Sequence, residues 1–433
     1  MVILIKTLQV ILALSVLIFI HELGHFTWAK IFGIRVEKFY LFFDIGGHAL
    51  ARWKWGETEF GIGWLPLGGY CKIAGMIDES MDLEQMKREP QSWEFRTHPA
   101  WQRLIVMAGG VVNNFIFAIL TYIAIMAIWG SSYVSNRGSR IYVSDLAYEM
   151  GFRNGDEILA FDDYVPEDFS SLQADLARRN VRKATVLRGA DTLDIYIDQA
   201  MIGDVINSPL MFDLAVPFVV DSVSVSGPNA GSELEHDDRI VAFDGVGIEF
   251  VQDSREVLAG MKERSVEATV LRGSDTLQVP VQVDTAGRIG VYMEMPNVKV
   301  QKYSLLQAVP AGLKLTGETI GGYLSDLRLL AKPSTGAYKS VGSFITIGQV
   351  FPSKWNWYQF LNILALLSIM LGVMNLLPIP GLDGGHILFT LYEMVTGRKP
   401  SEKFLVYAQM VGLVLLLALM FLAFGNDIGR LIH

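Results

Sequence analysis

Near its N-terminus the chain reads VILIKTLQVILALSVLIFIHELGH, residues Val2 to His25, a segment that joins an apolar run to a cluster of polar side chains. The apolar part, Val2 to Ile20, is long enough to cross the hydrocarbon core of a membrane, which needs about 20 helical residues. A cleaved signal peptide would also contain such a run, but no cleavage site of small residues follows this one. We therefore expect a retained membrane helix with polar groups at one end.

Three further stretches are long and apolar enough to span a membrane: Leu104 to Trp129, Phe360 to Leu377 and Leu405 to Phe424. The 433-residue chain is 51% hydrophobic and only 19% charged, with a mean hydropathy of +0.34. Ordinary soluble domains carry about 25% charged residues. This composition excludes a disordered chain and argues against a purely soluble one. It predicts a polytopic α-helical membrane protein with four transmembrane helices.

An internal repeat lies between the second and third apolar stretches, in a polar region rich in short β-type runs. ATVLRG at 184–189 recurs at 268–273, an offset of 84 residues, and DEILAFD at 156–162 is echoed by DRIVAFD at 238–244, an offset of 82. Two copies of one small domain explain both matches, and the two-residue difference fits an insertion between the matched strands. We therefore expect two β-rich domains inserted between the second and third membrane helices.

The predicted organisation has five parts. They are, in chain order, 1–130 with the first two membrane helices and the loop between them, 131–210 with the first inserted domain, 211–298 with the second, 299–355 with an amphipathic helix and a linker, and 356–433 with the last two membrane helices. In the fourth part, apolar residues recur at helical spacing from Leu305 to Leu330. This pattern predicts a helix that braces the inserted domains against the membrane.

Charge is distributed unevenly along the chain. The total of 36 basic and 45 acidic residues gives a net charge of −9, so the chain lacks the overall basic field of a nucleic-acid-binding protein. Basic residues gather beside the ends of the apolar stretches: Lys30, Arg35, Lys38, Arg96, Arg103, Arg398, Lys399 and Lys403. Loops rich in Lys and Arg tend to stay in the cytoplasm. We therefore expect these loops to be cytoplasmic and the inserted domains and both termini to lie outside, in the periplasm if the cell has one.

The HELGH segment carries the residues of a candidate metal site. His21 and His25 are one helical turn apart, so both imidazoles can face one metal ion, while Glu22 is offset toward a water molecule on that metal. Ionisable groups so close to a hydrocarbon layer are costly to keep there and are by default functional. The single cysteine, Cys71, excludes a cysteine-rich zinc site. We expect a hydrolytic zinc site with Glu22 as the general base.

A catalytic zinc ion needs a third protein ligand and an open position for water. The candidate segment is NLLPIPGLDGGH, residues 375–386, where two prolines and three glycines interrupt an apolar run. Unpaired backbone at membrane depth is tolerated only where it is buried in protein or lines a cavity. The break therefore indicates a site, and both Asp383 and His386 could supply the ligand.

HELGH together with NLLPIPGLDG at 375–384 resembles the site-2 protease family of intramembrane zinc metalloproteases. Four spans with a tandem PDZ-like insertion between the second and third are similar to the bacterial RseP branch of that family. The resemblance favours the carboxylate as the third ligand and implies roles for five residues: His21, His25 and Asp383 as ligands of Zn²⁺, Glu22 as the catalytic base, and Asn375 in positioning the substrate. It also implies a multi-pass protein of the bacterial inner membrane, with its active site toward the cytoplasmic side.

Two shorter segments extend the resemblance. GIGWLPLGGYCK at 61–72 is similar to the glycine-rich, membrane-associated β-hairpin of the family, and AGGVVNNF at 108–115 is similar to a segment of its second span in which Asn114 is the matching asparagine. The stretch 61–70, including Gly68, Gly69 and Tyr70, could add an unwound substrate segment as an extra strand. A plain amphipathic hairpin resting on the membrane is the alternative.

The predicted function is endoproteolysis of single-span membrane proteins within the lipid bilayer. The family suggests anti-sigma factors and remnant signal peptides as substrates, and its PDZ-like modules either filter substrates by size or capture an extended peptide. A membrane-anchored PDZ adaptor or chaperone with a structural or inactive metal site is the alternative, and a damaged HExxH or LDG motif would indicate it. A metal transporter would need polar groups along several spans, whereas the intramembrane acids are essentially Glu22 and Asp383.

Overall fold

The computed structural model describes residues 2–66, 68–76, 89–224, 227–293, 298–330, 332 and 342–432. Leu67 of the predicted hairpin, and residues 331 and 333–341 of the predicted 299–355 segment, lie outside the described residues. The chain forms two compact units. The membrane unit comprises 1–130, 302–328 and 339–433, and the inserted unit comprises 131–301 and 329–338.

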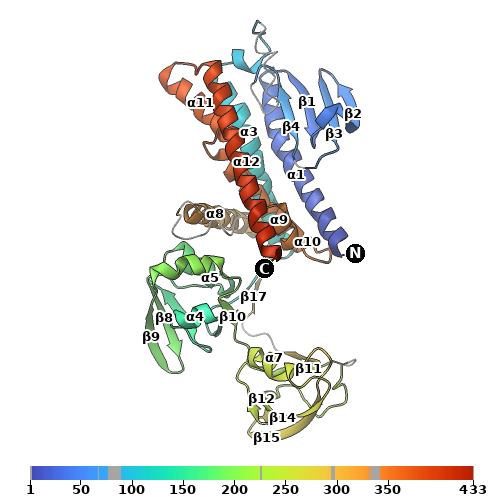
Figure 1. Ribbon diagram of the computed structural model, residues 1–433, viewed down its shortest axis with the longest axis vertical. Helices are drawn as coiled ribbons and strands as arrows, with labels where there is room; N and C mark the ends of the chain where they lie inside the picture. Colours follow the sequence, from blue (N-terminus) through green and yellow to red (C-terminus); the bar gives the residue numbers. More distant parts are fainter. Residues whose placement is uncertain are drawn as a thin grey trace. The chain divides into compact units, whose positions relative to one another are not determined.

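Four helices of the membrane unit are long and apolar enough to cross a membrane, as the sequence predicted. They are α1 (Val2–Ile31), α3 (Ala100–Ile128), α10 (Trp357–Leu376) and α12 (Glu402–Ile432). α1 continues through HELGH without interruption, because this segment contains no proline and its one glycine is tolerated in a helix. α1 packs along α3, and α3 packs along α10 (Figure 1).

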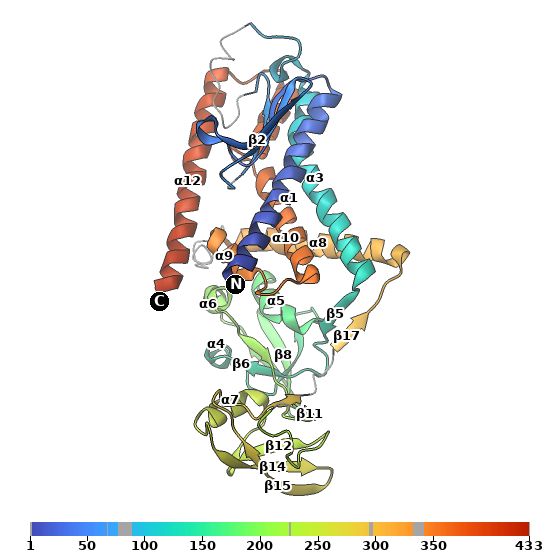
Figure 2. The same cartoon turned by 90° about the vertical axis from the view of Figure 1, so that its right-hand side faces the viewer.

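The loop between α1 and α3 forms a four-stranded sheet beside α1 (Figure 2). Its strands are β1 (Val36–Leu41), β2 (Ala49–Trp55), β3 (Thr58–Gly63) and β4 (Tyr70–Ile73), in the order β2-β3-β1-β4. Two short 3-10 turns lie in the same stretch of chain, η1 (Ile45–Gly47) between β1 and β2 and η2 (Phe95–Thr97) between β4 and α3.

The hairpin predicted over 61–72 is wrong, because β3 and β4 are not neighbours. β1 lies between them, parallel to β3 and antiparallel to β4, with Tyr40 opposite both Gly61 and Tyr70. A Cβ atom at Gly61 would overlap the Tyr40 ring, so the absence of a side chain at Gly61 leaves the space that this ring occupies. Gly61 to Gly63 are therefore interior to the sheet, and β4 is an edge strand among the described strands.

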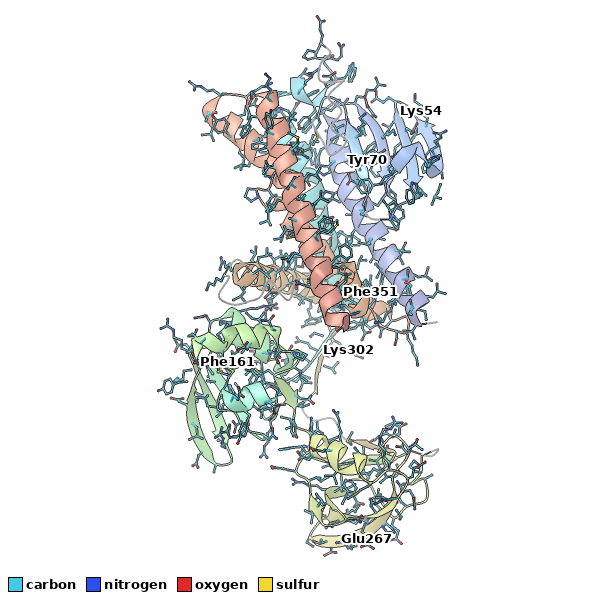
Figure 3. The ribbon with its side chains drawn as sticks, in the orientation of Figure 1. Lys54, Tyr70, Phe161, Glu267, Lys302 and Phe351 are labelled. Atoms are coloured by element: carbon cyan, nitrogen blue, oxygen red, sulfur yellow. The ribbon has the colours of Figure 1, made fainter. Side chains whose placement is uncertain are left out.

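The inserted unit contains two modules, and each has its own hydrophobic core. The first module, residues 131–215, comprises β5 (Ser131–Val134), β6 (Ile141–Val143), α4 (Asp145–Glu149), β7 (Glu157–Phe161), η3 (Phe169–Ser171), α5 (Leu172–Arg178), β8 (Lys183–Arg188), β9 (Asp191–Tyr196), η4 (Gln199–Met201), α6 (Ile202–Asn207) and β10 (Phe212–Leu214). The second module, residues 216–293, comprises β11 (Val220–Val223), β12 (Arg239–Phe243), β13 (Val246–Gly247), α7 (Val251–Ala259), β14 (Ser265–Arg272), β15 (Asp275–Gln282) and β16 (Val291–Met293). Figure 3 labels Phe161 in the first module and Glu267 in the second.

The two modules repeat one arrangement of strands. β7 pairs antiparallel with β8 and β12 with β14, and in both pairs the register shifts at the same place, between Ile158 and Ala160 and between Ile240 and Ala242. β8 has 6 residues and β14 has 8, and the two additional residues of β14 precede the shared ATVLR, which accounts for the two-residue difference in the sequence offsets. The internal repeat is therefore a structural repeat.

The edges of the modules differ slightly from the predicted limits. β10 pairs with β6, and Phe212 is buried in the core of the first module, so this module continues past residue 210. β17 (Val298–Gln301) pairs with β5 at the start of the inserted unit.

The remaining helices belong to the C-terminal half of the chain. They are α8 (Leu305–Leu330), α9 (Phe344–Val350) and α11 (Asp383–Thr396). α8 covers the residues that the periodicity predicted as a helix, and its Ala308 is buried in one cluster with Ala118 of α3 and Ala365 of α10.

A buried ion pair that recurs in both modules makes the stability of the second module depend on pH. Arg272 on β14 donates hydrogen bonds of 2.7 and 2.8 Å to the buried Asp238, as Arg188 does to Asp156 in the first module. The hydrogen bonds from Arg272 hold the pKa of Asp238 below its ordinary value, against the opposing effect of burial. The stability that this pair adds is therefore complete above the ordinary carboxyl pKa of about 3.9 and is lost as the pH falls through the lower pKa of the folded state.

Hydrogen exchange of β14 in the intact protein measures this contribution. Asp238→Asn should lower the protection of β14 amides at pH 7, and the difference from the wild type should shrink below about pH 4. Asp237→Asn, at a neighbouring side chain that is 74% exposed, is the matched control. Equal protection in the wild type and Asp238→Asn at pH 7 would contradict the assignment.

Candidate metal site

A break in the chain between α10 and α11 places Asp383. α10 ends at Leu376, two prolines follow, and Asp383 is the first residue of α11. Proline cannot continue a helix without losing a backbone hydrogen bond. The turn is so tight that a Cβ atom at Gly384 would overlap the carbonyl oxygen of Leu377. The side chain of Asp383 therefore starts from a fixed backbone position.

His21, His25 and Asp383 converge on one point. Oδ2 of Asp383 lies 3.2 Å from Nε2 of His21 and 3.4 Å from Nε2 of His25, and the two Nε2 atoms are 3.2 Å apart. Both imidazoles are buried. Within the described part of the chain, these three residues are the group of His, Cys, Asp and Glu side chains whose donor atoms lie close enough together to hold a metal ion.

The three donor atoms fit a tetrahedral zinc ion. Ligands about 2.0–2.1 Å from zinc lie about 3.3 Å apart at the corners of a tetrahedron, which is close to all three separations in the structure. Oδ2 of Asp383 is buried and has no hydrogen-bond partner among the described residues. A buried carboxylate oxygen without a partner is costly, and a cation between it and the two imidazoles would remove that cost.

Hydrogen bonds to the remaining ring nitrogens orient both imidazoles. Nδ1 of His25 lies 2.9 Å from the carbonyl oxygen of Val106, which can only accept, so Nδ1 carries the proton and Nε2 is left as a ligand. The side-chain amide of Asn114 lies 3.1 Å from Nδ1 of His21, and its own oxygen is buried without a partner. With the amide turned so that this oxygen accepts from Nδ1, His21 also presents Nε2 as a ligand.

Glycines on α1 and α3 leave room for the imidazoles at the place where these two helices pack closely. A Cβ atom at Gly24 would overlap the carbonyl of Gly109, and one at Gly110 would lie 2.5 Å from Nε2 of His25. The segment AGGVVNNF was compared with the family for its asparagine alone, so the sequence analysis missed the role of Gly109 and Gly110. The spacing of Gly24 within HELGH and the paired glycines of the second span were the available signals.

Glu22 lies at the same site, on the side of the sheet. Its carboxylate accepts a hydrogen bond from the backbone amide of Cys71 on β4 and is close enough to His21, His25 and Asp383 to interact electrostatically with them. The donor atoms of His21, His25 and Asp383 are called the donor triangle below. The residue predicted as the general base is therefore held between the donor triangle and the edge strand β4. Cys71 takes part in this contact through its backbone amide.

The other predicted site residues lie around this centre at different distances. Nδ2 of Asn375, on α10, is 3.3 Å from Nε2 of His21. Gly69 comes close to Ile18 of α1, and Gly68 to the Phe43 ring, where neither position has room for a Cβ atom. His386 does not join the donor triangle and instead lines a separate cavity.

Tyr70 fixes the start of β4 (Figure 3). Its ring stacks on Tyr40 with centroids 5.4 Å apart, and its hydroxyl donates a hydrogen bond of 2.8 Å to Asp44. Burial raises the pKa of Tyr70, and the hydrogen bond to Asp44 raises it further, so the hydroxyl stays protonated as a donor. This contact anchors the strand whose next residue, Cys71, bonds to Glu22.

Gly110→Ala tests the role of the close helix contact. The added Cβ atom would displace the His25 ring, and we expect zinc affinity to fall roughly 10- to 100-fold. Gly317→Ala, where a Cβ atom meets open space, is the control and should leave zinc affinity unchanged. The measurement is bound zinc after equilibration with a graded chelator, and unchanged affinity in Gly110→Ala would contradict the packing argument.

Asp383→Ala tests the third ligand. Removing the carboxylate leaves two imidazoles, too few for a stable zinc site, so purified protein should contain little zinc. His386→Ala should keep its full zinc content. If Asp383→Ala retains zinc and His386→Ala loses it, the third ligand is the histidine.

Comparisons with known proteins agree with this geometry. The model of the family described as peptidase family M50 matches residues 9–419. A protein of Salmonella typhi named "Regulator of sigma E protease" is 31% identical, with 97% of this chain and 98% of the relative covered. A protein of Vibrio cholerae named "Putative zinc metalloprotease" is 28% identical, again over 97% of this chain and 98% of the relative. The chain belongs to peptidase family M50, the site-2 protease family, and is a zinc metalloprotease of that family.

Proposed function

We propose that this metalloprotease is an intramembrane endopeptidase that cleaves single-span membrane proteins, with zinc held by His21, His25 and Asp383. The observation that carries the proposal is the position of the donor triangle. Both histidines lie in α1, a 30-residue helix of the length and apolar composition of a membrane span. Asp383 begins the helix that follows the end of α10, another such span. Polar groups are rarely kept in such surroundings without a function.

In the proposed mechanism of peptide hydrolysis, the zinc ion and the residues of the chain have separate roles. A bound zinc ion would polarise the scissile carbonyl and acidify a water molecule. Glu22 would accept the proton of that water and pass it to the leaving amine. Its hydrogen bond from the Cys71 amide holds the carboxylate beside the donor triangle, which suits a group that must act at one place in both proton transfers. Asn375, next to His21, would orient the substrate carbonyl.

The edge strand β4 would hold the substrate backbone. A membrane helix hides its amides in its own hydrogen bonds, so it must be unwound locally before attack. An unwound segment could pair with the open edge of β4 as an added strand. Gly68, Gly69 and Tyr70 lead into this edge, and their packing on α1 and Tyr40 sets its distance from Glu22.

The inserted modules would select substrates on the outer side of a bacterial inner membrane. Their repeated strand pairs and connecting helix support PDZ-like domains, which either capture an extended peptide or exclude proteins with bulky outer domains. The Salmonella typhi relative is named a regulator of sigma E protease, which favours anti-sigma factors as substrates. Remnant signal peptides are the second substrate class.

Glu22→Gln separates metal binding from catalysis. The amide cannot accept the proton of the attacking water, so cleavage of a reconstituted single-span substrate should fall by roughly 10²- to 10⁴-fold. Zinc content should remain that of the wild type. Glu57→Gln, at a side chain that is 51% exposed, is the matched control. Unimpaired cleavage by Glu22→Gln would overturn the proposed role.

A further inference from the structure

The proposed function assigns no role to α12, the last of the four apolar helices. Figure 2 shows this helix standing apart from α1 and α3. In its most apolar 18-residue stretch 11% of the residues are buried, compared with 39% in α3 and in α10. The buried residues among the described part of α12 fall into two groups along the helix: Gln409 with Gly412, and Ala423 with Asp427. The first group lies where α12 meets the segment that precedes Asp383.

Gly412 touches this segment through its backbone. A Cβ atom at Gly412 would overlap the carbonyl oxygen of Pro380. A Cβ atom at Gly381 would in turn lie 3.5 Å from the carbonyl carbon of Gly412 and 3.5 Å from Cδ1 of Leu416. The helix and the segment are therefore so close at this point that neither backbone leaves room for a further atom.

The segment that Gly412 touches is a tight turn. The amide of Leu382 donates a hydrogen bond of 3.1 Å to the carbonyl oxygen of Ile379, and Gly381 has a φ of +96°. Proline at the second position and a glycine with positive φ at the third are typical of a type II β-turn. Its two central residues, Pro380 and Gly381, are the ones that meet α12.

The turn and the start of α11 are joined closely. Leu382, the last residue of the turn, directly precedes Asp383, the first residue of α11. The amide of Gly385 donates a hydrogen bond of 3.0 Å to the carbonyl oxygen of Leu382, and a Cβ atom at Gly385 would lie 2.8 Å from Cα of Pro380. A displacement of the turn would therefore carry Asp383 with it.

The donor triangle tolerates little displacement of Asp383. Its donor atoms lie 3.2–3.4 Å apart, close to the separation of about 3.3 Å at a tetrahedral zinc ion. A metal site must be held within about 0.5 Å of its productive geometry. The imidazoles belong to α1 and are oriented by residues of α3, so a shift of the turn would move the carboxylate and leave the imidazoles in place.

We propose that Gly412 is a positioning residue for the third zinc ligand and acts through the 379–382 turn. The inference rests on the proposed assignment of Asp383 as that ligand. Because Gly412 has no side chain, α12 lies close enough to the turn to set its position. A methyl group at Gly412 would push the turn away from α12 and weaken the zinc site, although every ligand would still be present.

Gly412→Ala tests this proposal in the intact, detergent-solubilised protein. Zinc affinity, measured by equilibration with a graded chelator, should fall roughly 10- to 100-fold. Gly425→Ala lies on the same helix, where a Cβ atom meets open space, and should bind zinc like the wild type. Equal helix content by circular dichroism is the check that each variant is folded. Equal losses of affinity in the two variants would overturn the proposal.

A double variant shows whether Gly412 acts through Asp383. In the Asp383→Ala background, Gly412→Ala should cause no further loss of the residual zinc affinity, because the effects of coupled residues do not add. A general packing role would lower the affinity by the same factor in both backgrounds and would overturn the proposal. Full zinc retention by Asp383→Ala would overturn the ligand assignment and this inference together. Wild-type affinity in Gly412→Ala, with zinc lost from Asp383→Ala, would overturn this inference alone.

Leu416→Ala provides a second test that adds no atom and so does not depend on the folding of Gly412→Ala. The Leu416 side chain lies beside Gly381, and its removal would loosen the contact between α12 and the turn. Zinc affinity should fall by less than about tenfold. Leu417→Ala, at a neighbouring side chain that is 41% exposed, is the matched control and should leave the affinity unchanged. Wild-type affinity in Leu416→Ala, or equal losses in both leucine variants, would contradict the proposed contact.

Discussion

The structure depends on bringing three polar side chains together among helices that are long and apolar enough to cross a membrane. An imidazole or carboxylate in hydrocarbon is costly unless another polar group satisfies it. His21, His25 and Asp383 meet this condition only jointly, because their donor atoms lie 3.2–3.4 Å from one another. Three features of the fold allow these donor atoms to converge. They are the uninterrupted helix α1, the break after α10 and the tight contact of α1 with α3.

Backbone contacts, more than side-chain contacts, set the geometry around the site. Glycines at 24, 109 and 110 let α1 and α3 approach until the imidazoles fill the space between them, and Gly384 lets the chain turn sharply into α11. The Val106 carbonyl orients His25, and the Cys71 amide holds Glu22. Groups fixed in this way need little rearrangement when a substrate arrives, which is the condition for electrostatic stabilisation of a transition state.

The sequence predicted the parts of the fold that depend on local patterns. Long apolar runs identified four membrane helices, periodicity identified α8 from Leu305 to Leu330, and the repeat identified two similar modules. It misplaced the strands around 61–72, because the insertion of β1 between β3 and β4 is a long-range pairing that no local pattern records. The helix register that puts Asn114 beside His21 and Gly110 beside His25 is equally non-local. The candidate ligands His21 and His25 were identifiable because HExxH is a local motif, whereas choosing between Asp383 and His386 required the family resemblance.

The central claim is that two imidazoles and one carboxylate hold the zinc ion, and X-ray absorption at the zinc edge of the purified protein tests it most directly. We predict two imidazole nitrogens and two oxygens at about 2.0–2.1 Å and no sulfur. A third imidazole would assign the ligand to His386 instead of Asp383. A sulfur at about 2.3 Å would place Cys71 on the metal and contradict the account.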